Sequence, residues 1–194
     1  ENARPNIVLK TIDESFPGNV QTPKFSETLN TIVFEKVEHP YFSRIWVANE
    51  PLTALLSADA TKVYAEIEIF DEQSKTRYFM MGGRWAETKE IAHGGQPIEI
   101  DQIDIPPNGR QFCVDIGLKY QNEELFYGYN NETPLKNTNG FRDQDRQLSK
   151  GVYTIKTRFR CKGVDKSFWF KLTNPGKDEL VSLKSINPPK TLSK

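Results

Sequence analysis

The chain has 194 residues, and its 26 lysines and arginines are balanced by 26 aspartates and glutamates, so the formal net charge is zero. This balance gives no electrostatic basis for general binding to nucleic acid or to an anionic membrane surface. No stretch approaches the roughly 20 consecutive apolar residues of a membrane-spanning helix, so we expect no direct membrane insertion by this chain. The 12 phenylalanines, 7 tyrosines and 3 tryptophans predict a folded core.

The first third of the chain predicts short strands around an irregular stretch. We expect strands over residues 7–12, 31–37 and 41–47, where β-branched and aromatic residues are frequent. The polar residues 13–30, punctuated by glycine and proline, predict a long loop. Residues 51–60 are the one helical candidate, and that segment is too short to be convincing.

Apolar and polar residues alternate most clearly in four segments, residues 63–70, 112–119, 153–160 and 168–172. Weaker strand candidates cover residues 76–81, 98–105 and 125–129. Together these patterns predict an all-β protein, an immunoglobulin-like antiparallel β-sandwich of about nine strands with little or no helix.

The same patterns indicate one domain. We expect it to cover residues 1–176, with a core from about 31 to 176 and an N-terminal extension over 1–30. Residues 177–194, which include two consecutive prolines, predict a C-terminal tail or linker.

The outward positions of the 153–160 segment carry a stripe of basic residues, including Lys156, Arg158 and Arg160. Pairing with acidic residues across the sheet, such as Glu66 and Glu68, is the favoured interpretation. Binding of an anionic partner is the alternative.

Cys113 and Cys161 are the only cysteines, and their spacing fits no CxxC metal or redox motif. Cys113 falls on the face opposite Phe112 and Val114, whereas Cys161 continues the face that begins at Tyr153. We therefore predict two independent thiols rather than a disulfide.

Sequence signatures of catalysis and of cofactor binding are missing from the chain. His39 and His93 are the two histidines, and each lies beside turn residues, which is typical of a solvated loop. We expect no cofactor, no metal site and no enzymatic activity. An enzyme that uses carboxylates alone stays open as an alternative.

Aromatic residues provide the more specific candidate for a binding site. Flat rings beside amide groups bind sugars or peptides by stacking and hydrogen bonding. The candidate ligand-stacking residues are Trp85, Tyr127, Tyr129, Trp169, Asn130 and Asn131. For Trp85 a cap on the core, and for Trp169 packing against a neighbouring element, are the competing interpretations.

Four turn segments follow one another along the chain, residues 47–51, 58–60, 105–109 and 150–153. Their order resembles that of immunoglobulin-like modules of the CARDB and fibronectin type III kind. Three further segments are similar to uncharacterised prokaryotic proteins in which such a domain follows N-terminal membrane helices: residues 83–87, 127–132 and 168–176. The resemblance implies a membrane-anchored, extracytoplasmic module, and it carries over no catalytic residue. The chain lacks the Cys, Trp, Cys arrangement of antibody domains.

Taken together, these features predict a non-catalytic interaction or structural module, displayed next to a membrane, with a protein partner. A carbohydrate-binding module that uses surface aromatic residues is the alternative, with a glycan as its ligand. The chain begins at Glu1 rather than at methionine, which predicts a processed product or an excised piece. A cytoplasmic location is the alternative to an extracytoplasmic one.

Overall fold

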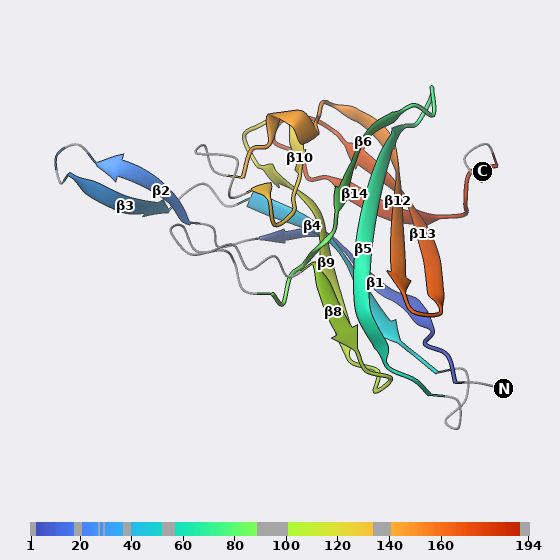
Figure 1. The fold of residues 1–194 in the computed structure, drawn as a ribbon. Coiled ribbons are helices and arrows are strands. Elements are labelled where there is room, and N and C mark those ends of the chain that lie inside the picture. The colour runs from blue at the N-terminus through green and yellow to red at the C-terminus, as the bar shows by residue number, and fades with distance from the viewer. Residues whose placement is uncertain are drawn as a thin grey trace.

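The computed structural model describes residues 3–17, 21–26, 28, 30–36, 40–51, 57–88, 101–133 and 141–190. Over these ranges the protein forms two six-stranded antiparallel sheets and a separate two-stranded hairpin. The two sheets pack face to face as a sandwich, which confirms the predicted all-β fold class (Figure 1). The described ranges hold one 3-10 turn, η2 (Gln144–Arg146).

The first sheet has the strand order β1-β4-β9-β10-β11, and β7 also pairs with β9. Its strands are β1 (Ile7–Pro17), β4 (Pro40–Asn49), β7 (Arg84–Trp85), β9 (Gln111–Tyr120), β10 (Phe126–Gly128) and β11 (Gln147–Leu148).

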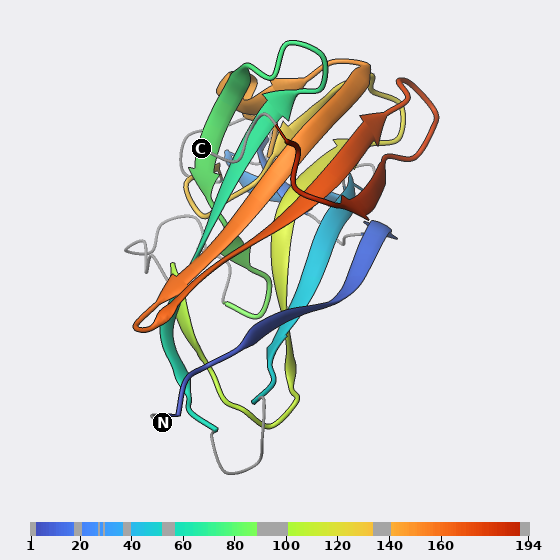
Figure 2. The same cartoon turned by 90° about the vertical axis from the view of Figure 1, so that its right-hand side faces the viewer.

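The second sheet has the order β14-β13-β12-β5-β6, and β8 also pairs with β5. Its strands are β5 (Ala60–Asp71), β6 (Arg77–Gly82), β8 (Gln102–Ile105), β12 (Gly151–Cys161), β13 (Val164–Asn174) and β14 (Ser182–Ile186). Figure 2 shows β12 and β13 (orange to red) lying in front of β4 and β9 (cyan and yellow) of the first sheet.

The hairpin consists of β2 (Gln21–Ser26) and β3 (Thr31–Lys36), and it stands away from the sandwich (Figure 1).

Alternation along the central strands builds the core. Val63, Ala65, Ile67 and Ile69 of β5 are fully buried and face the first sheet, as the two-residue period predicts. Burial of each such isoleucine side chain contributes roughly 1.5–3 kcal/mol. The opposing layer comes from apolar residues of the first sheet, including Ile45, Val47, Val114 and Ile116.

The predicted strand number is too low, because the two sheets together contain twelve strands and the hairpin adds two. Among the missed strands, β7 and β11 have only two residues each. So short a segment cannot show a periodic pattern. The predicted loop over 13–30 is also wrong in part, since β1 continues to Pro17 and β2 covers 21–26.

Both predicted boundaries of the core need correction. The N-terminal extension contributes β1, which pairs with β4 and places Ile7 in the core. The predicted tail contributes β14, which pairs with β13, and Val181 and Leu183 are buried against the core. The sandwich therefore uses chain on both sides of the predicted core range.

A bulge in β9 interrupts the predicted alternation of residues 112–119. Ser43 of β4 pairs with Gly117, whereas the next residue, Arg44, pairs with Asp115, so Ile116 is the extra residue. Beyond the bulge Leu118 leaves the main core and joins an aromatic cluster around Tyr120. A pattern of strict alternation misassigns every residue past such a bulge.

The basic stripe on the outer face of the second sheet is neutralised within the sheet. Lys156 Nζ donates to Glu68 Oε1 at 3.0 Å, and Arg160 Nη2 donates to Glu66 Oε2 at 2.8 Å. Both are cross-strand pairs between β12 and β5, which confirms the favoured interpretation. This face offers an anionic partner little unpaired charge from those residues.

Candidate functional site

Trp85, the first predicted stacking residue, lies in the core. Its side chain is fully buried in β7, with its ring centroid 5.9 Å from that of Phe159 on the opposite sheet. The alternative interpretation, a cap on the core, is therefore the one that the structure supports.

Trp85 reaches the core because the chain changes sheets just before it. β6 pairs with β5 in the second sheet and β7 pairs with β9 in the first, with Gly83 between them. A Cβ atom at Gly83 would lie 2.8 Å from the Cβ of Ala65 and 3.0 Å from Cγ1 of Val114. These neighbours belong to the two different sheets, so only glycine fits at the crossing point.

Trp169, the second predicted tryptophan, lies on the outer face of the second sheet. Its ring packs against Phe70 at a centroid distance of 6.3 Å, and the ammonium group of Lys156 lies 5.6 Å from its centroid. Neighbouring side chains therefore bury it almost completely. This confirms packing against a neighbouring element.

Tyr127 and Tyr129 belong to a buried aromatic cluster on the outer face of the first sheet. Tyr129 lies edge-on to Phe42 at 5.5 Å, and the hydroxyl of Tyr127 donates to Glu123 at 2.9 Å. Because both rings are buried, neither presents a face for stacking against a ligand.

The side chains of Asn130 and Asn131 are also hydrogen-bonded within the protein. Asn130 Oδ1 accepts from Arg146 Nη1 at 2.6 Å, and Asn131 Nδ2 donates to Asp101 at 3.3 Å. They line a hollow of about 70 Å³, well below the roughly 300–1,000 Å³ of small-molecule sites. The predicted stacking site therefore lacks both exposed rings and room.

A buried ion cluster lies on the first sheet, where the guanidinium of Arg84 is 5.3 Å from the ring centroid of Tyr129. Asp115 has no exposed surface, and its two carboxylate oxygens accept from Arg44 Nε and Arg84 Nη1, both at 2.6 Å. The guanidinium of Arg44 also lies 4.7 Å from the centroid of Phe42. With both carboxylate oxygens engaged, Asp115 is bound as a structural anchor and is not placed to act as a base.

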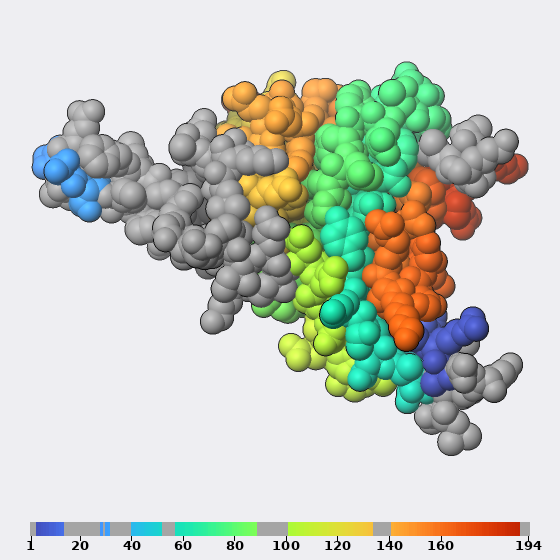
Figure 3. All heavy atoms as spheres, viewed as in Figure 1, coloured from blue at the N-terminus to red at the C-terminus, as the bar shows by residue number. Residues whose placement is uncertain are grey.

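The exposed apolar residues gather on one edge strand instead. Tyr78 is 56% exposed and Met80 is 49% exposed, and both lie on β6. The one other large apolar side chain exposed among the described residues is Leu180, at 53%, which lies in the connection between β13 and β14. Figure 3 shows β6 (green) at the molecular surface.

Tyr78 is directed by a bulge in β6. Ile69 of β5 pairs with Phe79, whereas Phe70 pairs with Arg77, so Tyr78 is the extra residue. Its ring lies edge-on to Tyr153 at 5.5 Å. The bulge therefore brings an exposed ring to the end of the sandwich, beside the turn that joins β5 to β6.

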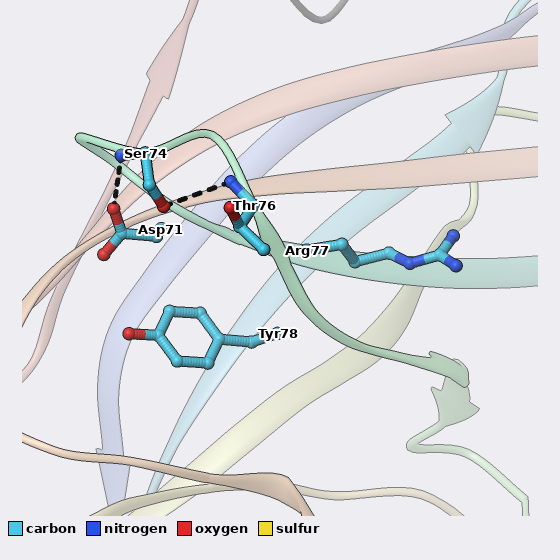
Figure 4. Close-up of a pocket in the computed structure, with 5 residues that line it drawn as sticks. All are labelled: Asp71, Ser74, Thr76, Arg77 and Tyr78. Atoms are coloured by element: carbon cyan, nitrogen blue, oxygen red, sulfur yellow. Dashed lines mark hydrogen bonds between the residues drawn. The ribbon is translucent and has the colours of Figure 1, made fainter.

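A hollow of about 360 Å³ lies next to this ring, lined by Asp71, Ser74, Thr76, Arg77 and Tyr78 (Figure 4). Asp71 Oδ1 accepts from the Ser74 amide at 2.6 Å, and Ser74 Oγ accepts from the Thr76 amide at 3.3 Å. The hydrogen bond from the Ser74 amide holds the pKa of Asp71 below its usual value. These hydrogen bonds fix the conformation of the turn that lines the hollow.

A second hollow of about 470 Å³ shares Asp71 and Tyr78 with the first and extends to Tyr153 and Lys171. Both volumes lie in the range of binding pockets. The candidate site is therefore β6 with these two hollows beside Tyr78, and we refer to it as the β6 edge site.

Sequence reasoning missed the β6 edge site. Residues 76–81 appear only as a weak strand candidate, and nothing in their pattern shows that the strand is at an edge or bulged. The available signal was a run of four consecutive apolar residues, Tyr78 to Met81. A strand that is buried on one face only alternates apolar with polar residues, so this run indicates apolar side chains on both faces.

Neither metal binding nor thiol chemistry is indicated in the described part of the chain. No group of three or more His, Cys, Asp or Glu side chains there is placed to hold a metal ion. Cys113 and Cys161 are free thiols on different sheets, and burial raises the pKa of the Cys113 thiol. The predictions for His39 and His93 concern positions outside the described residues.

The fold defines the class of the protein, a two-sheet antiparallel β-sandwich. No family model, no curated protein and no solved structure matches the chain. Among the described residues, no helix is both long and apolar enough to cross a membrane.

Proposed function

We propose that this protein is a non-catalytic interaction module, displayed next to a membrane, that binds a protein partner at the β6 edge site. The observation that carries the proposal is the position of Tyr78 and Met80. Two of the three exposed large apolar side chains in the described ranges lie on one six-residue strand at the edge of a sheet. Exposed apolar groups that cluster, rather than scatter, are typical of interaction surfaces.

The neighbouring hollows add polar groups to this apolar edge. Arg77 and Asp71 line the first hollow together with Tyr78, so a partner there would contact apolar groups and hydrogen-bonding groups at the same time. Interfaces commonly combine an aromatic anchor with a polar rim in this way. The four predicted stacking rings are buried, so the proposal does not rest on carbohydrate binding through them.

Selection of short random peptides on the immobilised protein tests the site. We expect the enriched peptides to bind the Tyr78→Ser/Met80→Ser variant about tenfold more weakly or worse, because truncation of an anchor typically costs more than 1 kcal/mol. The Leu180→Ser variant is the matched control, since it removes an equally exposed apolar side chain elsewhere, and we expect its affinity to equal that of the wild type. Titration calorimetry measures all three.

All substitutions in this set are at exposed positions, so the unfolding midpoints should stay close to that of the wild type. Enrichment of no peptide, or equal affinity of all three proteins for the enriched peptides, would contradict the proposed site.

Display next to a membrane is supported by the resemblance to CARDB and fibronectin type III modules and to domains that follow membrane helices. The coding sequence upstream of Glu1 tests this part of the proposal. We expect it to encode a hydrophobic segment of about 20 residues or a cleavable leader. A start codon directly before Glu1, or a cytoplasmic domain in that place, would overturn the membrane location and leave the β6 edge site untouched.

A further inference from the structure

Among the described residues, no strand lies beyond β6 at this edge of the second sheet. β5 pairs with β12 along one side, and its other side is shared by β6 and β8, which follow one another along its length. In the part of the chain that the structure describes, β6 pairs with β5 alone. An edge strand of this kind carries a row of backbone donors and acceptors on its outer side.

The hydrogen-bond register identifies which backbone groups face outward. The Gly83 amide donates to the Ala65 carbonyl at 2.8 Å, so the backbone N–H of Gly83 points toward β5. Inward and outward residues alternate along an antiparallel strand. Counting back from Gly83, Met81 faces β5 and the N–H and C=O groups of Met80 point away from β5.

Three other sheet edges, at β1, β14 and β11, are protected in ways that β6 is not. β1 carries Lys10, ends at Pro17 and has two register shifts against β4. β14 carries Lys184 and is followed by two prolines, and β11 has only two residues. Lysine, proline, bulges and short length all discourage edge pairing. In β6 the bulge is at Tyr78, and residues 79–82 contain neither charge nor proline.

We infer that the partner of the β6 edge site is an extended polypeptide segment that adds to β6 as a further strand of the second sheet. The inference rests on the proposed function and specifies the chemistry of the partner. A peptide backbone is the ligand whose alternating donors and acceptors match an open strand edge. Two copies of the chain joined along six residues alone would share little surface compared with the roughly 1,200–2,000 Å² of stable protein pairs.

The site also indicates the side-chain pattern of the partner. One set of alternate side chains in an added strand would lie beside Met80 on the outer face, where Glu68 is already paired with Lys156 and Arg77. The other set would point toward Tyr78 and the hollow beside it. We therefore expect an uncharged segment, with apolar residues at every second position and without proline.

Replacement of Met80 by proline tests strand addition. Proline removes the N–H group that faces the open edge without removing a hydrogen bond to β5, and proline is tolerated at sheet edges. Met80→Ala is the matched control, because it removes the same side chain and keeps the N–H group. With a peptide enriched on the wild type, we expect binding to Met80→Pro to be at least about tenfold weaker than binding to Met80→Ala.

A change in the peptide provides the second arm and leaves the protein unaltered. N-methylation of the peptide backbone at alternate positions removes donors that pair with β6, and methylation at the intervening positions does not. Strand addition therefore predicts that one alternating set abolishes binding and the other is tolerated.

The outcomes separate the inference from the proposed function. Loss of binding in Tyr78→Ser/Met80→Ser, with equal binding to Met80→Pro and Met80→Ala and no alternation in the methylation series, would overturn strand addition and keep the binding site. A concentration-dependent dimer, measured by sedimentation and abolished by Met80→Pro, would overturn the peptide partner in favour of a second copy.

Discussion

Replacement of Asp115 by alanine is expected to lower the free energy of unfolding by about 3–5 kcal/mol, because it leaves two guanidinium groups without their shared buried carboxylate. Arg84 is almost fully buried and Arg44 is mostly buried, so water cannot take over the lost hydrogen bonds. Urea denaturation followed by tryptophan fluorescence measures the loss.

Asp165→Ala is the matched control for this experiment. Asp165 also pairs with an arginine, Arg158, but its side chain is more than half exposed. A surface ion pair contributes about 0–1 kcal/mol, so we expect a loss of that size. Losses of equal size at Asp115 and Asp165 would show that the cluster on the first sheet does not anchor the fold.

Replacement of Trp85 by alanine is expected to cost about 3–5 kcal/mol of stability, the range typical of removing a large buried aromatic side chain. Trp85 is fully buried and packs against Phe159 of the opposite sheet, so the cavity would lie between the two layers. Thermal unfolding by circular dichroism should show a midpoint lowered by many degrees.

Trp85→Phe distinguishes packing from hydrogen bonding at this position. The indole Nε1 of Trp85 has no hydrogen-bond partner among the described residues, so phenylalanine removes a donor that contributes no bond. We expect a clearly smaller loss for phenylalanine than for alanine. A binding role for the Trp85 ring would instead require that both variants keep wild-type stability and lose a ligand.

The regular part of the fold follows from local pattern. Val63 to Ile69 alternate without interruption, and the cross-strand pairing of Lys156 with Glu68 follows from opposite charge on adjacent outward positions. Such features depend on neighbours in sequence or on simple complementarity, so periodicity and charge were sufficient to predict them.

The parts that failed depend on long-range register. The bulge at Ile116 turns Leu118 to the opposite face, and its position is defined only by the pairing of β9 with β4. The same holds for Tyr78 in β6, whose exposure depends on a bulge against β5. The predicted stacking residues are buried because tryptophan and tyrosine pack in a core as readily as they bind a ligand at a surface, so residue type alone does not identify a binding site.

The single-residue crossing at Gly83 has a mechanical consequence. The backbone from β6 to β7 is one uninterrupted segment that belongs to both sheets. A pulling force on β6 therefore reaches β7 in the first sheet through the covalent backbone, and it passes from β7 to β9 through the pairing of those two strands. Since β9 is also hydrogen-bonded to β4 and β10, we expect the load to spread across the first sheet.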